Sequence, residues 1–137
     1  MSDNRNMTDG GISCLAQGCI HLLSINIGGS FSQLTDASLA WHGCDSIGET
    51  CRGLTSIDMS YNIKITDGGI SCLVPGCIHL QSISIGGSCT QLTDASLAAI
   101  GESCRGLTSI DMSGNINMTD GCISCHVMSC HVLSCLV

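Results

Sequence analysis

Apolar residues recur along the chain in a pattern whose period changes partway through. Residues 54–59 read Leu-x-x-Ile-x-Met, and the last two apolar residues alternate with a polar one. This period of two predicts a short strand with one buried face. Further along, Leu97, Ile100 and Cys104 are spaced by three and then four residues, which predicts a short helix. Equivalent strand patterns occur at residues 22–27, 80–85 and 107–112.

A Thr-Asp pair precedes each predicted helix. The threonine oxygen can accept a hydrogen bond from an amide that has no partner in the first helical turn, and the aspartate carboxylate suits the positive end of the helix dipole. We interpret the pairs as helix caps and not as acid–base catalysts, because they recur in every unit. In one class of unit, Pro75 or Gly76 ends the helix. The pairs begin at Thr8, Thr35, Thr66, Thr93 and Thr119.

Self-comparison shows that the strand-and-helix unit is an internal repeat. The ten residues 51–60 return unchanged at residues 104–113. A repeat-opening cysteine recurs every 26 or 27 residues, apart from one spacing of 32 that contains five extra residues at 41–45. The predicted single domain at residues 1–137 divides into a partial unit at 5–18, units at 19–50, 51–76, 77–103 and 104–129, and a partial unit at 130–137.

One unit of this size cannot bury its own apolar side, so neighbouring units must stack. Successive strands then run in the same direction and form a parallel sheet on the concave side, with short helices on the convex side. The predicted fold class is an α/β solenoid with the shape of a short horseshoe. A repeat of about 26 residues falls within the range of about 20–29 residues that leucine-rich repeats occupy.

The pattern Cys-x-x-Leu-x-x-Ile-x-Met-x-x-Asn-x-x-Ile-Thr-Asp-x-x-Ile-x-x-Leu at residues 51–73 resembles the cysteine-containing subclass of leucine-rich repeats. That subclass is best known from substrate-receptor subunits of F-box-type ubiquitin ligases and from related cytosolic repeat proteins. The resemblance implies a non-catalytic protein-interaction module, in the form of a substrate-recognition or scaffold piece of a ubiquitin-ligase-like assembly.

The chain departs from the subclass in two ways. The position after the strand is Asn62 and Asn115 in one class of unit but Ser30 and Ser88 in the other. Nothing at the N-terminus resembles an F-box helical segment, so a ligase role is not carried over. The resemblance therefore defines the fold better than the biology.

Composition narrows the expected classes of function. The net charge is -7 with four Lys and Arg residues, and no basic cluster exists, so we expect neither nucleic acid nor membrane as a partner. No apolar run is long enough to span a bilayer, and residues 1–8 lack the apolar stretch of a secretion signal. We therefore expect reduced cysteines and a location in the cytoplasm or the nucleus. Because the common catalytic motifs are absent, we expect neither an enzyme nor a cofactor.

Polar residues that alternate with the buried strand residues should face the concave side. This face is expected to be shallow and mildly acidic, and it would suit a basic or polar peptide. A solvated face that is kept polar for solubility is the favoured alternative. Tyr61 is the one candidate of the residue types that dominate interfaces. The candidate contact residues are Asn26, Thr55, Asp58, Tyr61, Gln81, Ser84, Thr108 and Asp111.

The five-residue insertion carries a second candidate for partner binding, Trp41, followed by His42. The insertion lies in a helical region and should lengthen it or make it bulge on the convex side. An exposed tryptophan there would anchor a protein partner. A tryptophan folded back over a neighbouring helix is at least as compatible with the sequence.

Cysteine and histidine residues crowd the C-terminal part of the chain, and Cys-x2-Cys spacing can hold zinc. In register, Cys125 and Cys130 take positions that other units also fill with cysteine, so we expect no metal site and interpret most cysteines as buried apolar thiols. Two alternatives stay open. One is a fragment of a longer array that has no settled partner and self-associates through uncapped ends. The other is a metal-binding protein that uses Cys122, His126, Cys130 and His131.

Overall fold

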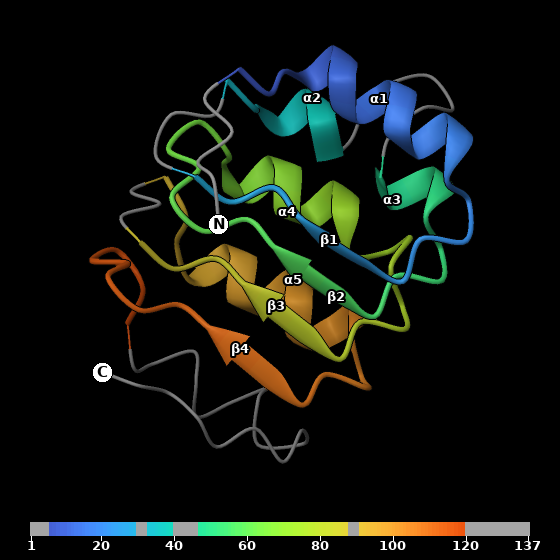
Figure 1. Ribbon diagram of the computed structural model, residues 1–137. Helices are drawn as coiled ribbons and strands as arrows, with labels where there is room; N and C mark the ends of the chain where they lie inside the picture. The colour runs from blue at the N-terminus through green and yellow to red at the C-terminus, as the bar shows by residue number, and fades with distance from the viewer. Residues whose placement is uncertain (1–5, 30–32, 40–46, 88–90, 120–137) are drawn as a thin grey trace.

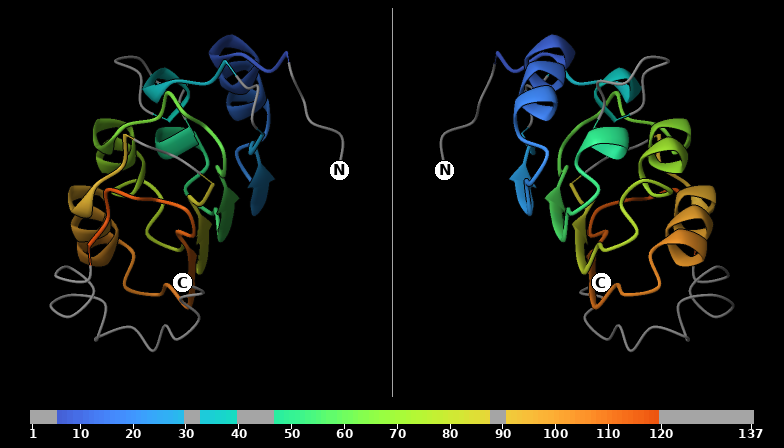
Figure 2. Two further views of the ribbon diagram at one scale, coloured as in Figure 1. Left: turned by 90° about the vertical axis from the view of Figure 1, so that its left-hand side faces the viewer. Right: turned by 90° about the vertical axis from the view of Figure 1, so that its right-hand side faces the viewer.

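The computed structural model describes residues 6–29, 33–39, 47–87 and 91–119. In this part of the chain, four short parallel strands form one sheet in the order β1-β2-β3-β4. The strands form one layer and the helices the other, as the side views of Figure 2 show. This confirms the predicted α/β solenoid. The strands of Figure 1 are β1 (Ser24–Asn26), β2 (Ser56–Asp58), β3 (Ser82–Ser84) and β4 (Ser109–Asp111).

The described helices are α1 (Asp9–Gly18), α2 (Asp36–Leu39), α3 (Ile47–Thr50), α4 (Asp67–Leu73) and α5 (Asp94–Ser103). In the view of Figure 1, α4 and α5 lie behind the sheet and α1 lies above it. Successive strands begin 32, 26 and 27 residues apart, which matches the spacing of the repeat-opening cysteines. The exact boundaries of the units stay a prediction.

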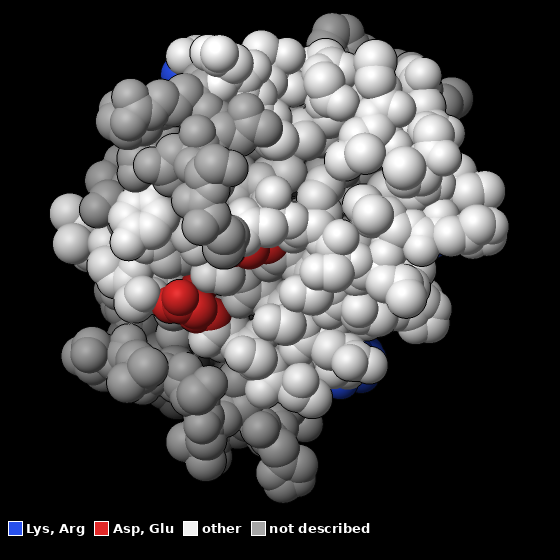
Figure 3. Space-filling view, viewed as in Figure 1, with Lys and Arg blue, Asp and Glu red and all other residues white. Residues whose placement is uncertain are grey.

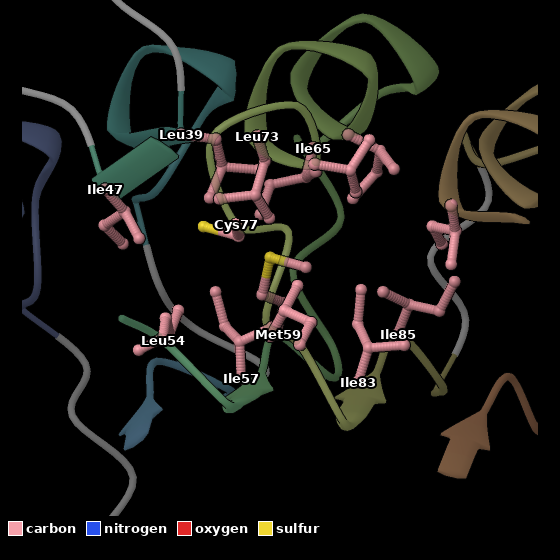
Figure 4. Packing of buried hydrophobic residues seen from close by; sticks show 14 of the residues in the cluster. Leu39, Ile47, Leu54, Ile57, Met59, Ile65, Leu73, Cys77, Ile83 and Ile85 are labelled. Atoms are coloured by element: carbon pink, nitrogen blue, oxygen red, sulfur yellow. The ribbon is translucent and has the colours of Figure 1, made fainter. Parts of the chain in front are cut away.

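The sheet register stacks identical residues from one repeat to the next. Ile57 of β2 pairs with Ile25 on one side and with Ile83 on the other, and Ile83 pairs with Ile110. All four isoleucines are buried. Figure 4 shows Ile57, Met59 and Ile83 extending from the strands toward the helix layer. The period-two pattern of the sequence therefore corresponds to one continuous core between the two layers.

Three of the cysteines that open the repeats form part of this core, whereas Cys19 is only partly buried. Cys51, Cys77 and Cys104 have no exposed surface. The thiols of Cys51 and Cys104 lie 3.7 Å from the carbonyl oxygens of Cys19 and Cys77, each in the preceding repeat. Burial, together with the neighbouring thiols of Cys104 and Cys51, raises the pKa of Cys77 to about 12. The thiol of Cys77 is therefore held in the neutral, unreactive form.

The prediction that most cysteines are buried is wrong for two of them. Cys14 in α1 and Cys72 in α4 are exposed. Each lies two residues after a buried isoleucine, Ile12 or Ile70, and two helical residues correspond to a rotation of about 200°. The helix that buries the isoleucine therefore turns the cysteine away from the core.

The five-residue insertion lies between two helical segments that the structure describes. The matching unit has one helix, α5, where this unit has α2 before the insertion and α3 after it. Leu39 at the end of α2 and Ile47 at the start of α3 are both fully buried. The core register is therefore kept on both sides of the insertion. The expected longer or bulged helix at residues 41–45 stays a prediction. Trp41 and His42 lie outside the described residues.

The expected caps are present at the helices whose first residues follow a threonine. The hydroxyl oxygen of Thr8 accepts a hydrogen bond from the amide of Gly11 at 3.4 Å. Thr66 and Thr93 accept equivalent bonds from the amides of Gly68 and Ala95 at 3.1 and 3.2 Å. Each threonine thus satisfies one of the amides that the first helical turn leaves without a partner.

The aspartate that follows each threonine connects neighbouring repeats. The carboxylate of Asp36 accepts hydrogen bonds from both the amide and the hydroxyl of Thr66 in the next repeat, at 2.7 and 2.6 Å. Asp67 binds Thr93 in the same way, at 2.8 and 2.7 Å. We call this arrangement the Thr–Asp clasp. It is also present between Asp9 and Thr35 and between Asp94 and Thr119.

Two clasps lower the pKa of their aspartates. Burial acts to raise the pKa of Asp67, but hydrogen bonds from Ser96 and Thr93 outweigh it, and the pKa is lowered. Hydrogen bonds from the side chain and backbone of Thr119 lower the pKa of Asp94. The clasps therefore favour the ionised carboxylate.

A buried asparagine closes the turn after β2. Asn62 donates from Nδ2 to the carbonyl oxygens of Ile27 and Met59, at 3.0 and 2.9 Å. Asn115 donates to the carbonyl of Ile85 at 2.7 Å in the equivalent turn after β4. Each amide thus binds the backbone of the preceding repeat.

None of the helices in the described ranges is long and apolar enough to cross a membrane.

Candidate protein-binding face

The concave side of the sheet is covered by small polar side chains. Because strand residues alternate between the two faces, the isoleucine at the centre of each strand is buried and its two neighbours point outward. We call this surface the strand face. Figure 3 looks onto it and shows acidic side chains within the face and basic ones at its margin. The strand face consists of Ser24, Asn26, Ser56, Asp58, Ser82, Ser84, Ser109 and Asp111.

The last outward residue of each strand belongs to one hydrogen-bonded row. Asn26 donates from Nδ2 to Oδ2 of Asp58 at 2.8 Å. The hydroxyls of Ser60 and Ser84 lie 2.6 Å apart, and Ser84 donates to Oδ2 of Asp111 at 3.4 Å. The row crosses all four described strands. The structure thus brings together four of the residues that the sequence proposed: Asn26, Asp58, Ser84 and Asp111.

The two aspartates of the row are fixed by their own backbone as well. Oδ1 of Asp58 accepts from the amide of Ser60 at 3.0 Å, and Oδ1 of Asp111 accepts from the amide of Ser113 at the same distance. Hydrogen bonds from the backbone and side chain of Ser113 lower the pKa of Asp111. Asp111 therefore keeps its negative charge near neutral pH in a defined orientation.

The two candidate threonines have a structural use. Thr55 donates its hydroxyl to the carbonyl of Leu23 at 2.9 Å, and Thr108 donates to the carbonyl of Gln81 at 3.0 Å. Their hydroxyl protons therefore connect adjacent repeats and are not free to bind a partner. Gln81 is exposed at the same level of the sheet. A contact role for these three residues stays a prediction.

Tyr61 lies just beyond the strand face, in the turn that follows β2. Its side chain is 52% exposed, and its backbone has φ 64°. The matching residue after β4 is Gly114, with φ 76°. The turn therefore imposes a left-handed backbone, which glycine adopts easily and tyrosine does not.

Large apolar side chains are exposed at both ends of the strands, a feature that the sequence reasoning missed. Ile20 and Ile78 occupy equivalent positions before the strands, and Ile63 and Ile116 occupy equivalent positions after them. Leu23 is exposed at the start of β1. Ile20 and Ile78 directly follow an opening cysteine, where the other units have Arg52 and Arg105. Because arginine is rarely buried, the alternation of isoleucine and arginine at this position could have shown that Ile20 and Ile78 lie on the surface.

The weak metal candidates are not brought together by anything that the structure describes. Cys122, His126, Cys130 and His131 lie outside the described residues. Within the described ranges, no group of three or more His, Cys, Asp or Glu side chains could hold a metal ion. A metal site at those four C-terminal residues therefore stays a prediction.

One comparison with known protein families agrees with the fold. Residues 50–74 match the family described as Leucine Rich repeat. The chain also has a similarity to a solved structure described as the crystal structure of the Rad7 and Elc1 complex in yeast. The identity is 22% and the TM-score is 0.49, over 77% of this chain and 22% of that chain. The chain thus spans less than a quarter of the length of that protein.

The matched repeat, the parallel sheet and the buried cysteines agree on the fold. Residues 50–74 form a leucine-rich repeat, and the neighbouring strands stack on it in parallel, so the described part of the chain has the fold of a leucine-rich-repeat solenoid. Neither the partner nor the biological assembly follows from the fold, because one fold serves many functions.

Proposed function

We propose that this chain is a non-catalytic protein-interaction module that receives its partner on the strand face. The observation that carries the proposal is the hydrogen-bonded row from Asn26 to Asp111. Its side chains are already held in place by neighbouring repeats. Binding to a surface that is ordered in advance loses less conformational entropy than binding to mobile side chains.

The surface is wide enough for an extended segment of a partner. Four strands spaced about 4.8 Å apart present outward side chains at regular intervals. Small serine side chains leave the backbone of the sheet accessible, so a partner can approach closely. In its finer form, the proposal is a substrate-recognition or scaffold component of a ubiquitin-ligase-like assembly, acting in the cytoplasm or the nucleus. Self-association and a contact at Trp41 and His42 also stay proposals.

Site-specific photocrosslinking tests which face binds. A photoreactive phenylalanine derivative placed at Ser109 on the strand face is expected to crosslink the partner in native extract. The same group placed at Glu102, which is exposed on α5, is expected not to. Crosslinks that form from Glu102 and not from Ser109 would show that the helix layer binds the partner.

A matched pair of variants supports the same test. Ser109→Arg adds a bulky charged side chain to the strand face and should abolish capture of the crosslinked partner. Glu102→Arg makes a comparable change on the helix layer and should leave capture unchanged. Unfolding curves of both variants control for loss of the fold. The proposal fails if both folded variants capture the partner as well as the original protein.

A further inference from the structure

Two of the repeats are identical over ten residues, and Tyr61 is the first position at which they differ. Residues 51–60 and 104–113 have the same sequence, and the next residue is Tyr61 in one repeat and Gly114 in the other. Both positions have a left-handed backbone. Glycine is the residue that this conformation favours, so the tyrosine is not there to suit the turn. A use for its side chain is the remaining explanation.

The ring of Tyr61 lies against the following repeat at a place without a side chain. A Cβ atom on Gly87 would lie 2.5 Å from the Cδ1 and Cε1 atoms of Tyr61, so only glycine leaves room for the ring. The amide of Tyr61 donates to the carbonyl of Gly86 at 3.0 Å, which fixes the chain beneath the ring. The ring is thus held in place while half of the side chain remains exposed.

A carboxylate lies close to the same pair of glycines. A Cβ atom on Gly86 would lie 3.1 Å from Oδ1 of Asp111. The Tyr61 ring thus lies against Gly87 and the Asp111 carboxylate lies close to Gly86, so two adjacent glycines without side chains are next to both groups. Asp111 is exposed and negatively charged, and no basic residue belongs to the strand face as described.

An aromatic face beside a carboxylate is complementary to a planar cation. A guanidinium group can stack on the ring and donate hydrogen bonds to the carboxylate at the same time, which an ammonium group does less well. We propose that the Tyr61 ring and the Asp111 carboxylate form a binding seat for an arginine side chain of the protein that docks on the strand face. This inference rests on the proposed function and names the chemistry of its partner.

A purely structural role for the tyrosine makes a different prediction. If the ring only shields the turn, replacing it with glycine should weaken the fold and leave the affinity for arginine unaffected. If the ring is part of a seat, the replacement should reduce binding, whereas the fold should tolerate it because Gly114 fills the same position in the matching repeat.

Nuclear magnetic resonance with short peptides tests the seat directly. The probe is acetyl-Gly-Arg-Gly-amide, titrated into the full chain labelled with nitrogen-15. The control is the same peptide with citrulline, which keeps the shape of arginine and lacks its charge. We expect the arginine peptide to shift the backbone amide signals of Gly86, Gly87 and Ser113, and added salt to reduce the shifts. The citrulline peptide should shift them much less.

Three test variants and one control variant extend this experiment. Tyr61→Gly, and Tyr61→Asn as a second replacement that tolerates the left-handed backbone, should each bind the arginine peptide about two- to fivefold more weakly, as expected for an exposed cation–π contact. Asp111→Asn should weaken binding by up to about fivefold. Glu102→Gln should leave it unchanged.

Any one of three results would contradict the proposed arginine seat. The arginine and citrulline peptides could give equal shifts, the shifts could be confined to other parts of the chain, or both Tyr61 variants could bind with full affinity. These outcomes differ from a failure of the proposed function. If a partner crosslinks from Ser109 but the arginine peptide does not bind, the strand face remains the docking surface and the arginine seat is wrong.

Discussion

Thr66 donates both its amide and its hydroxyl to the carboxylate of Asp36 in the preceding repeat, at 2.7 and 2.6 Å. Thr66 thus acts twice, because its hydroxyl oxygen also caps its own helix, and Thr35 and Thr93 do the same. The aspartate acts on the next repeat and not on its own. The clasp therefore couples helix formation in one unit to stacking on its neighbour. That coupling is the nearest-neighbour term on which a solenoid depends.

Removal of one clasp should weaken the whole array. In Asp36→Asn, one carboxylate oxygen becomes an NH2 group that cannot accept from Thr66. We expect the free energy of unfolding to fall by about 1.5–3 kcal/mol, since hydrogen bonds to a charged acceptor have that value. Urea unfolding followed by circular dichroism measures it. Glu102→Gln, an exposed change on α5, is the control and should stay within about 0.5 kcal/mol of the original protein. An equally small change in Asp36→Asn would contradict the role of the clasp.

The clasps also predict how stability depends on pH. The folded-state pKa values of Asp67 and Asp94 are lowered below the ordinary value of an aspartate, so the unfolded chain binds protons at a higher pH than the folded chain. The free energy of unfolding should therefore be fully developed above the unfolded pKa and should fall as the pH drops from there through the folded pKa. Thr93→Val removes the hydroxyl that donates to Asp67, so its loss of stability in acid should be shallower. Identical acid profiles for both proteins would count against this explanation.

The two left-handed turn residues should respond to substitution with opposite signs. Tyr61→Gly relieves a conformation that costs a non-glycine residue about 1–2 kcal/mol, and the flexibility of glycine in the unfolded chain offsets part of the gain. We expect the melting temperature to stay the same or to rise. Gly114→Ala introduces the same strain and should lower stability by about 1 kcal/mol or more. A marked loss of stability in Tyr61→Gly would show that the ring is needed for the fold.

Thiol labelling should divide the described cysteines into two groups. Cys14 and Cys72 are exposed, so a maleimide reagent should modify them quickly in the folded protein. Cys51, Cys77 and Cys104 are buried, and the pKa of Cys77 is about 12, so these three should react only after unfolding. Mass spectrometry of peptides from a time course assigns the sites. Rapid labelling of Cys77 without denaturant would contradict the packing of the core.

The sequence by itself determined the architecture of this protein. The alternation around Ile57 defined a strand with one buried face, and the recurrence of the same pattern defined a stack of parallel strands. Both inferences succeeded because they depend on local geometry: side chains alternate along a strand, and one small unit cannot bury its apolar side alone. The exposure of Cys72 could also have been predicted from the sequence, because a helix that buries Ile70 turns a residue two positions later outward.

Only the tertiary structure decided the contacts between repeats. The sequence placed Asp36 at a helix start, but its partner Thr66 is 30 residues away and is chosen by the stacking of units. The position of Tyr61 against Gly87 has the same origin, since a left-handed turn in one repeat directs the ring onto the next. The periodicity of the sequence predicts which side of a unit is buried. Packing and hydrogen bonds between units set how one unit aligns on its neighbour, and this alignment cannot be predicted from a local sequence pattern.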